Sequence, residues 1–138
     1  NLIFEAEENL ESVYADKQKI EQVIVNLVSN ARYALEQKSQ ESKNFDEKEI
    51  QINLSNDSHR SNVILEVIDN GIGMDKEEKD NCLNPFFTTK EVGQGTGLGL
   101  SIVYNIVQEI DGKIEIESNE TSGTTFRITF PTKEDLGG

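Results

Sequence analysis

The chain has 138 residues, enough for one domain with a hydrophobic core, and its mean hydropathy of −0.54 indicates a globular protein with a polar surface. Its formal charge of −13 argues against nucleic acid and against direct contact with an anionic membrane, and no segment approaches the ~18 apolar residues of a membrane span. The single Cys82 excludes an internal disulfide framework and fits a reducing compartment.

In chain order, the first predicted elements are a short strand and a long helix. LIFEAE, residues 2–7, alternates apolar and polar side chains as a strand does. The helix is predicted to begin after a capping Asp16 and to end near Lys38, and the polar residues 38–49 are predicted to form a loop. The helix carries one apolar stripe, formed by Ile20, Val23, Ile24, Leu27, Val28, Ala31 and Leu35.

The rest of the chain predicts two strand pairs with a helix between them. Residues 50–54 and 63–69 alternate around the turn-rich SNDSHRSN, which predicts a hairpin. In residues 75–94 the apolar side chains follow neither a helical nor a strand period. KIEIES and TTFRITFP, residues 113–118 and 124–131, predict two closing strands around a turn. The helix before them is marked by Leu100, Val103, Ile106, Val107 and Ile110.

Together these elements predict an α/β two-layer sandwich, in which the helices pack on one face of a mixed, largely antiparallel sheet. The other face of the sheet is expected to carry polar side chains. They are Glu115, Glu117, Arg127 and Thr129.

Two asparagines on the first helix are candidates for a functional site. Asn26 and Asn30 are one turn apart on the shoulder of the apolar stripe, with Gln22 and Tyr33 beyond them. Asparagine is a mediocre helix former, so two of them beside a core need a reason. Their amides could tie down the backbone of a neighbouring loop. Alternatively, an amide oxygen could bind Mg²⁺, which prefers hard oxygens and takes further ligands from nucleotide phosphates.

DNGIGMD, residues 69–75, follows a predicted strand. Gly71 and Gly73 allow a sharp turn and would admit a flat ligand against the backbone. A buried carboxylate at Asp69 could accept a hydrogen bond from an exocyclic amine such as that of adenine. Taken alone, however, D-N-G is a turn signal.

Two further strings suit phosphate binding. NPFFTTK, residues 84–90, offers two hydroxyls and one cation, and its two aromatic side chains could anchor a loop. In GQGTGLGLSIVYNIV, residues 93–107, glycine occupies alternate positions directly before a helix, whose N-terminus suits an anion. The run could also be a flexible linker, and it matches neither the P-loop nor the Rossmann spacing. Its alternating glycines are Gly93, Gly95, Gly97 and Gly99.

In this order, the strings resemble the four boxes of the catalytic, ATP-binding domain of bacterial sensor histidine kinases, a member of the GHKL superfamily. NLVSNARYAL resembles the N box, DNGIGM the first glycine box, NPFFTTK the F box and GTGLGLSIV the second glycine box. The resemblance covers residues 2–131. Any one box is a weak signal, whereas four in order are highly specific.

The resemblance implies that residues 1–138 form a single catalytic domain that binds ATP and Mg²⁺. Residues 75–94 would be its ATP lid, anchored by Phe86 and Phe87. Asn30 would bind the metal, with Asn26 lining the same site, and Lys90 would contact phosphate as the third catalytic residue. The implied nucleotide-binding set is Asn26, Asn30, Tyr33, Asp69, Gly71, Gly73, Met74, Phe87, Thr88, Thr89, Lys90, Gly95, Thr96, Gly97, Leu98, Gly99, Leu100 and Thr124.

The chain departs from the common pattern of the family at two places. Tyr33 and Ala34 stand where many members have Lys-Tyr, which resembles the nitrogen-regulation-type subgroup and leaves open which side chain stacks on adenine. IDGK, residues 110–113, replaces the common His-Gly-Gly. ATPases of the superfamily also carry a glutamate one turn before the metal-binding asparagine, where it activates water. Asn26 cannot act as that base, which favours transfer to a protein acceptor over hydrolysis.

The implied function is transfer of the ATP γ-phosphate to a histidine on a separate dimerisation domain, with a downstream response regulator as a second partner. His59, the only histidine, lies in a predicted turn and is not the expected acceptor, so the phosphoacceptor domain is taken to be absent. The domain is expected to be cytoplasmic, whether or not its parent is anchored in a membrane. The alternatives are a GHKL-type ATPase or ATP-gated clamp and a non-catalytic nucleotide-binding module.

Overall fold

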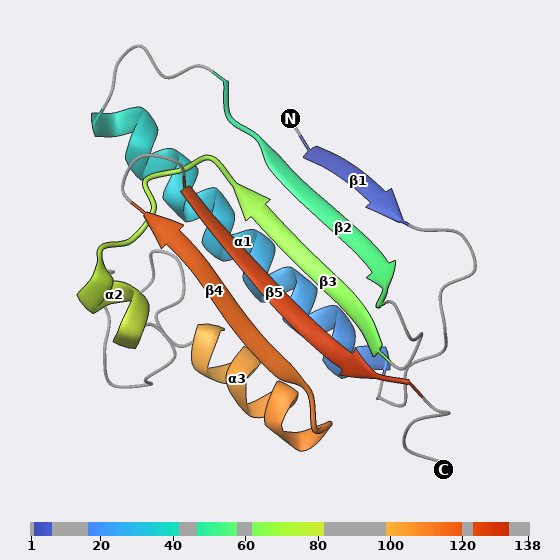
Figure 1. Cartoon of the computed structure of the whole chain (residues 1–138). Coiled ribbons are helices and arrows are strands. Elements are labelled where there is room, and N and C mark those ends of the chain that lie inside the picture. Colours follow the sequence, from blue (N-terminus) through green and yellow to red (C-terminus); the bar gives the residue numbers. More distant parts are fainter. Residues whose placement is uncertain are drawn as a thin grey trace.

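The computed structural model describes residues 2–6, 17–41, 47–57, 62–81, 99–119 and 123–132. The described strands form one five-stranded sheet, and α1 and α3 pack on one of its faces (Figure 1). The predicted α/β two-layer sandwich is therefore confirmed. The strands are β1 (Leu2–Ala6), β2 (Ile50–Asn56), β3 (Asn62–Asp69), β4 (Lys113–Asn119) and β5 (Gly123–Pro131), and the helices are α1 (Lys17–Glu41), α2 (Lys76–Asn81) and α3 (Gly99–Glu109).

The strand order is β1-β2-β3-β5-β4, with β1 parallel to β2 and every other neighbouring pair antiparallel. β2 with β3 and β4 with β5 are antiparallel neighbours in space and in the chain, as the turn signals predict. The pairing of β3 with β5 joins these two units into one sheet and places Asp69 directly opposite Thr124. Because paired residues project to the same face, these two side chains lie on the helix side of the sheet.

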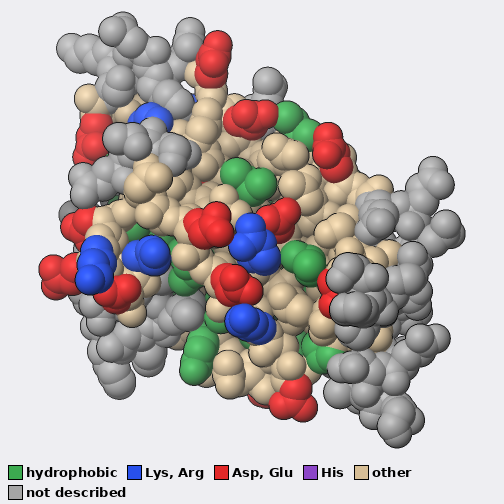
Figure 2. Space-filling view, in the orientation of Figure 1, with side chains coloured by type: hydrophobic (Ala, Val, Ile, Leu, Met, Phe, Trp, Pro, Cys, Tyr) green, Lys and Arg blue, Asp and Glu red, His purple; other side chains and the backbone are tan. Residues whose placement is uncertain are grey.

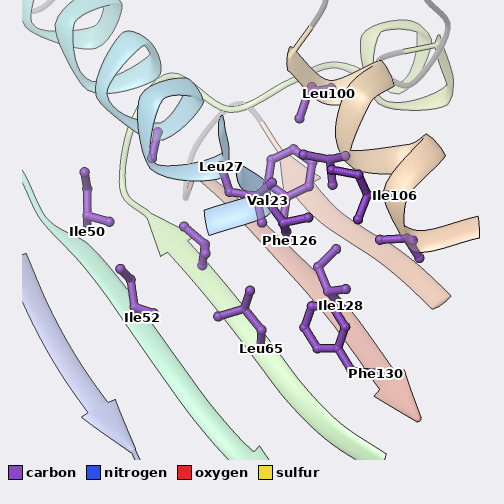
Figure 3. Close-up of a cluster of buried hydrophobic side chains, with 14 of the residues drawn as sticks. Val23, Leu27, Ile50, Ile52, Leu65, Leu100, Ile106, Phe126, Ile128 and Phe130 are labelled. Atoms are coloured by element: carbon purple, nitrogen blue, oxygen red, sulfur yellow. The ribbon is translucent and has the colours of Figure 1, made fainter. Parts of the chain in front are cut away.

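The core fills the space between the sheet and the two long helices (Figure 3). Leu65 and Phe126 point inward from the neighbouring strands β3 and β5, and Leu27 and Val103 meet them from α1 and α3. Every residue of the apolar stripe predicted for the first helix belongs to this core or packs against it. None of the described helices has the length and apolarity needed to cross a lipid bilayer.

The opposite face of the sheet is polar, as predicted, and Arg127 of β5 is at its centre. Figure 2 shows acidic side chains gathered around basic ones on this face. The Arg127 guanidinium donates to Glu66 through Nε at 3.0 Å and Nη2 at 2.9 Å, and its Nη1 donates to Glu117 at 3.3 Å. These cross-strand pairs link β3, β5 and β4 on the face that the helices leave uncovered.

Two helical segments differ from the sequence predictions. α1 continues to Glu41, so the loop predicted after Lys38 is wrong for its first residues. Lysine, glutamine and glutamate favour an exposed last helical turn as much as a loop.

α2 lies in residues 75–94, where the sequence showed no helical or strand period. Its start is a capping box, in which Asp75 Oδ1 accepts from the Glu78 N–H at 2.8 Å and Glu78 Oε1 accepts from the Asp75 N–H at 3.4 Å. Asp16, His59 and Cys82 lie outside the described residues.

The turn after α3 contains a backbone conformation that favours glycine. Asp111 has a φ of 57°, in the left-handed region. It stands at the position where the common His-Gly-Gly pattern has its first glycine. We expect Asp111→Gly to raise the free energy of unfolding by about 0.5–1 kcal/mol and Asp111→Val to lower it by at least as much. Urea denaturation of both variants measures this difference, and equal midpoints for the two would contradict it.

Candidate nucleotide-binding site

The first component of the site is a buried carboxylate at the end of β3. Asp69 is 3% exposed, and its Oδ1 accepts a hydrogen bond from the Gly71 N–H at 2.8 Å. Burial raises the pKa of Asp69 to about 6, although backbone N–H donors on Gly71 and Thr124 and the charge of Lys38 act to lower it. Above this pH the side chain is a charged hydrogen-bond acceptor enclosed by protein.

The turn that follows Asp69 packs directly on α1. The Ile72 N–H donates to the carbonyl of Ala34 at 3.1 Å. A Cβ atom on Gly71 would lie 2.7 Å from the carbonyl carbon of Ala34, so glycine is required because the helix comes so close. Gly71 was predicted to shape the base pocket; in the structure its missing side chain makes room for α1.

Lys38 and Asn70 hold this turn from two further directions. The Lys38 ammonium donates to the Asn70 carbonyl at 3.1 Å. The Asn70 side chain accepts from the Glu49 N–H at 2.9 Å and donates to the Glu47 carbonyl at 2.7 Å. This contact of Lys38 was not predicted from the sequence. Its position in the last turn of a helix was visible, but nothing in the sequence linked it to Asp69.

The hairpin of β4 and β5 holds the second half of the turn. Gly73 has a φ of 71°, a conformation that favours glycine. The N–H of Met74 donates to the Ser118 hydroxyl at 2.8 Å, and the Ser118 Oγ lies 2.7 Å from the Thr124 Oγ1 and 3.1 Å from the Gly123 carbonyl oxygen. Ser118 therefore holds this turn against β5, a second contact that was not predicted from the sequence.

The two asparagines lie on α1 beside this turn. Asn30 is 9% exposed and lies one helical turn before Ala34, which contacts Gly71, while Asn26 is half-buried one turn earlier. Tyr33 is half-buried on the same helix. The structure thus brings the first predicted motif against the second.

The orientation of α3 brings the start of the fourth motif toward the same helix. α1 and α3 run antiparallel (Figure 1), and Lys19 in the first turn of α1 pairs with Glu109 in the last turn of α3. Gly99 lies about 15 Å from Glu109 along α3, since each helical residue advances about 1.5 Å. A distance of about 15 Å along α1, measured from Lys19, reaches Ser29. The first turn of α3 is therefore close to the level of the two asparagines.

The remaining predicted site residues divide into two groups. Leu100 is 6% exposed and belongs to the hydrophobic core, so its side chain packs against protein. The others lie outside the described residues. They are Phe86, Phe87, Thr88, Thr89, Lys90, Gly95, Thr96, Gly97 and Leu98.

Comparison with known proteins identifies the family of the chain. The family model HATPase_c, described as histidine kinase-, DNA gyrase B- and HSP90-like ATPase, matches residues 15–134. The chain belongs to the HATPase_c family. The family assignment confirms the resemblance to the superfamily that the motifs indicated.

The relatives of this HATPase_c domain include sensor kinases. It is 40% identical over 123 residues to the sensor kinase CckA of Brucella abortus, with 86% of this chain and 13% of CckA covered. It is 34% identical over 140 residues to the sensor histidine kinase ZraS of Escherichia coli, with 99% of this chain and 27% of ZraS covered. The chain thus spans about a quarter or less of the length of these relatives.

The fold of the HATPase_c domain also matches a solved kinase domain. The catalytic domain of the histidine kinase ThkA superposes with a TM-score of 0.74 at 35% identity, covering 96% of this chain and 78% of that one. The mixed sheet with helices on one face is therefore the fold of a histidine kinase catalytic domain.

Proposed function

We propose that the chain is the ATP-binding catalytic domain of a sensor histidine kinase, which transfers the γ-phosphate of ATP to a histidine on a separate dimerisation domain. The observation that carries the proposal is the buried Asp69 carboxylate, which lies opposite Thr124 on the central strands while the turn after it packs on α1 beside Asn30. The similarity to sensor kinases supports the same function.

The chemistry of Asp69 favours adenine as the base. An ionised carboxylate only accepts hydrogen bonds, and the exocyclic amine of adenine only donates them at this edge. Guanine carries a carbonyl oxygen at the equivalent position, and two acceptors facing each other in a buried site are unfavourable. Asp69 therefore favours adenine, whose amino group occupies the ring position where guanine has its carbonyl oxygen.

The asparagines fit a magnesium ion that is held mostly by phosphate. In the described ranges, His, Cys, Asp and Glu side chains do not gather in threes to hold a metal. Mg²⁺ commonly keeps several waters and takes its other oxygens from substrate phosphates and one or two protein groups. The neutral amide oxygen of the buried Asn30 suits this role because it adds no negative charge beside a triphosphate. Lys90, the lid of residues 75–94 and the glycines before α3 would complete the phosphate site.

The proposed reaction is transfer rather than hydrolysis, because Asn26 stands where a water-activating base is needed and an amide cannot remove a proton. The acceptor histidine nitrogen would attack the γ-phosphorus as ADP leaves, and the protein would contribute positioning and charge neutralisation. A response regulator would then be the downstream partner. Tyr33 and Ala34 support placement in the nitrogen-regulation-type subgroup.

Asn30→Asp tests the proposed metal site. The substitution places a carboxylate beside the triphosphate and removes the neutral amide, so we expect at least about a tenfold loss of phosphotransfer. The measurement adds ATP, Mg²⁺ and a helical acceptor domain from a sensor kinase, and quantifies acid-labile phosphohistidine on that domain.

Asn105→Asp is the matched control, because Asn105 is an exposed asparagine on α3 and receives the same chemical change. It should transfer phosphate at the wild-type rate. Equal rates for Asn30→Asp and Asn105→Asp would overturn the metal assignment. Steady phosphate release by the wild-type protein without acceptor would instead favour an ATPase.

A further inference from the structure

Lys38, in the last turn of α1, belongs to none of the four motifs, yet it contacts the turn that follows Asp69. Its half-buried side chain donates to the Asn70 carbonyl at 3.1 Å. One helical turn earlier, the Ala34 carbonyl accepts from the Ile72 N–H at 3.1 Å. α1 therefore holds this turn at two successive levels, once through its main chain and once through a charged side chain.

One peptide group connects Lys38 with Asp69. The Asn70 carbonyl and the Gly71 N–H are the two ends of the same planar peptide, and they point in opposite directions. Lys38 binds the carbonyl end, while the N–H end donates to Asp69 Oδ1 at 2.8 Å. A positive ammonium, a peptide dipole and a carboxylate thus follow one another head to tail, and each hydrogen bond in such a chain polarises the next.

The charge of Lys38 acts on Asp69 across this peptide. Burial raises the pKa of Asp69 to about 6, and the N–H donors of Gly71 and Thr124 and the charge of Lys38 oppose the rise. Other charged residues around the turn in the described chain are exposed. Among them are Glu41 on α1, Glu47, Lys48 and Glu49 before β2, and Asp75 after the turn.

We propose that Lys38 is a positioning residue for base recognition: its ammonium fixes the Asn70–Gly71 peptide with the N–H toward Asp69, and it stabilises the carboxylate that accepts the amino group of adenine. This inference rests on the proposed function. A carboxylate offers about four lone-pair sites, and the N–H groups of Gly71 and Thr124 take part of this capacity. The rest is available to a base while Asp69 stays ionised and its turn stays in place.

The test compares dissociation constants of the full chain for Mg-ATP and for the Mg complex of purine riboside triphosphate, which lacks the amino group. Both ligands carry the same triphosphate, so protonation of phosphate and any loosening of the fold cancel in the ratio. We expect the wild-type protein to prefer ATP by about tenfold or more, the value of one hydrogen bond to a charged group. The preference should fall as the pH drops through about 6, because a protonated Asp69 loses acceptor capacity.

Lys38→Met removes the charge and keeps most of the apolar stem. It should move the midpoint of this pH profile upward by at least about half a pH unit, because loss of a nearby cation favours the protonated carboxyl. Lys38→Arg, which keeps the charge and a donor, should retain the wild-type midpoint. Lys113→Met is the matched control, since it removes the same charge from an exposed side chain on the other face of the sheet.

The outcomes separate this proposal from the proposed function. A Lys38→Met protein with the wild-type midpoint would overturn the role of Lys38 and leave the proposed function standing. A wild-type protein that bound no Mg-ATP would overturn both. If Lys38→Met fails to fold, Lys38→Gln, which keeps a donor for the Asn70 carbonyl, replaces it with the same expectation.

Two further measurements check that Lys38 acts through Asp69. An NMR titration of the Asp69 carboxyl carbon in the nucleotide-free protein should give a higher pKa in Lys38→Met than in Lys113→Met, and equal values would contradict the proposal. In an Asp69→Asn background, adding Lys38→Met should leave the ATP preference unchanged, because both residues belong to one hydrogen-bond chain. A further decrease in the double mutant would contradict action through Asp69.

Discussion

Asp69→Asn is expected to stabilise the nucleotide-free domain at neutral pH while it weakens binding of Mg-ATP at least about tenfold. Burial raises the pKa of this carboxyl from 3.8 to about 6. A pKa raised by folding means that the carboxyl favours the folded state only in its protonated form. This contribution is complete below pH 3.8 and is lost as the pH rises through about 6. At pH 7 the charged form therefore costs the fold roughly 3 kcal/mol relative to acid conditions.

The measurement is chemical denaturation of wild type and variant at pH 7.5 and pH 4.5. The variant should be more stable by roughly 2 kcal/mol at the higher pH, and the gap should narrow at the lower pH, where the wild-type carboxyl is protonated. Asp80→Asn is the control, because Asp80 is exposed on α2. A stability gap that did not change with pH would contradict the burial of a charged Asp69.

Gly123→Ala is expected to destabilise the domain by about 3 kcal/mol or more, and with it to abolish nucleotide binding. Gly123 has a φ of 97°, and a Cβ atom there would lie 2.1 Å from the carbonyl oxygen of Asp69. Neither the backbone conformation nor the space accepts a side chain, and the obstacle is the backbone of a central strand, which cannot move aside as a flexible side chain can.

Urea unfolding monitored by circular dichroism measures this effect, with Thr125→Ala as the neighbouring control on the other face of β5. Gly71→Ala should cost less. Its Cβ would also meet backbone, at 2.7 Å, but Gly71 has no positive φ and its obstacle is a helix that can shift as a unit. A free energy of unfolding for Gly123→Ala within about 1 kcal/mol of wild type would contradict this account.

The elements that depend on local patterns were predicted well. Alternating apolar and polar side chains predicted the strands, and turn-forming residues between them predicted the two antiparallel pairs. The pairing of β3 with β5 and the parallel pairing of β1 with β2 join segments that are distant in the chain, and periodicity carries no information about such partners. α2 was missed although its capping box, Asp75 and Glu78, is visible in the sequence, because the helix is too short to show an apolar stripe.

The same distinction applies to the site. Asn30 and Asp69 could be predicted as site residues because their motifs have recognisable spacing. Lys38 and Ser118 were missed because each acts through a contact with a residue far along the chain, 32 and 44 positions away respectively. Motif spacing identifies the groups that face a ligand, whereas the groups that hold them in place emerge only from the folded arrangement.

Asp69 and Thr124 lie on β3 and β5, two of the three inner strands, and this position would link ligand occupancy to cooperative unfolding. A nucleotide bound there would contact strands that hydrogen-bond to neighbours on both sides, so unfolding of the site would also disrupt the sheet around it. At a ligand concentration of 100 times Kd, this linkage adds about 2.7 kcal/mol to the unfolding free energy. Amide protons of β3 and β5 should therefore exchange with deuterium more slowly when nucleotide is bound, even where they lie far from the base.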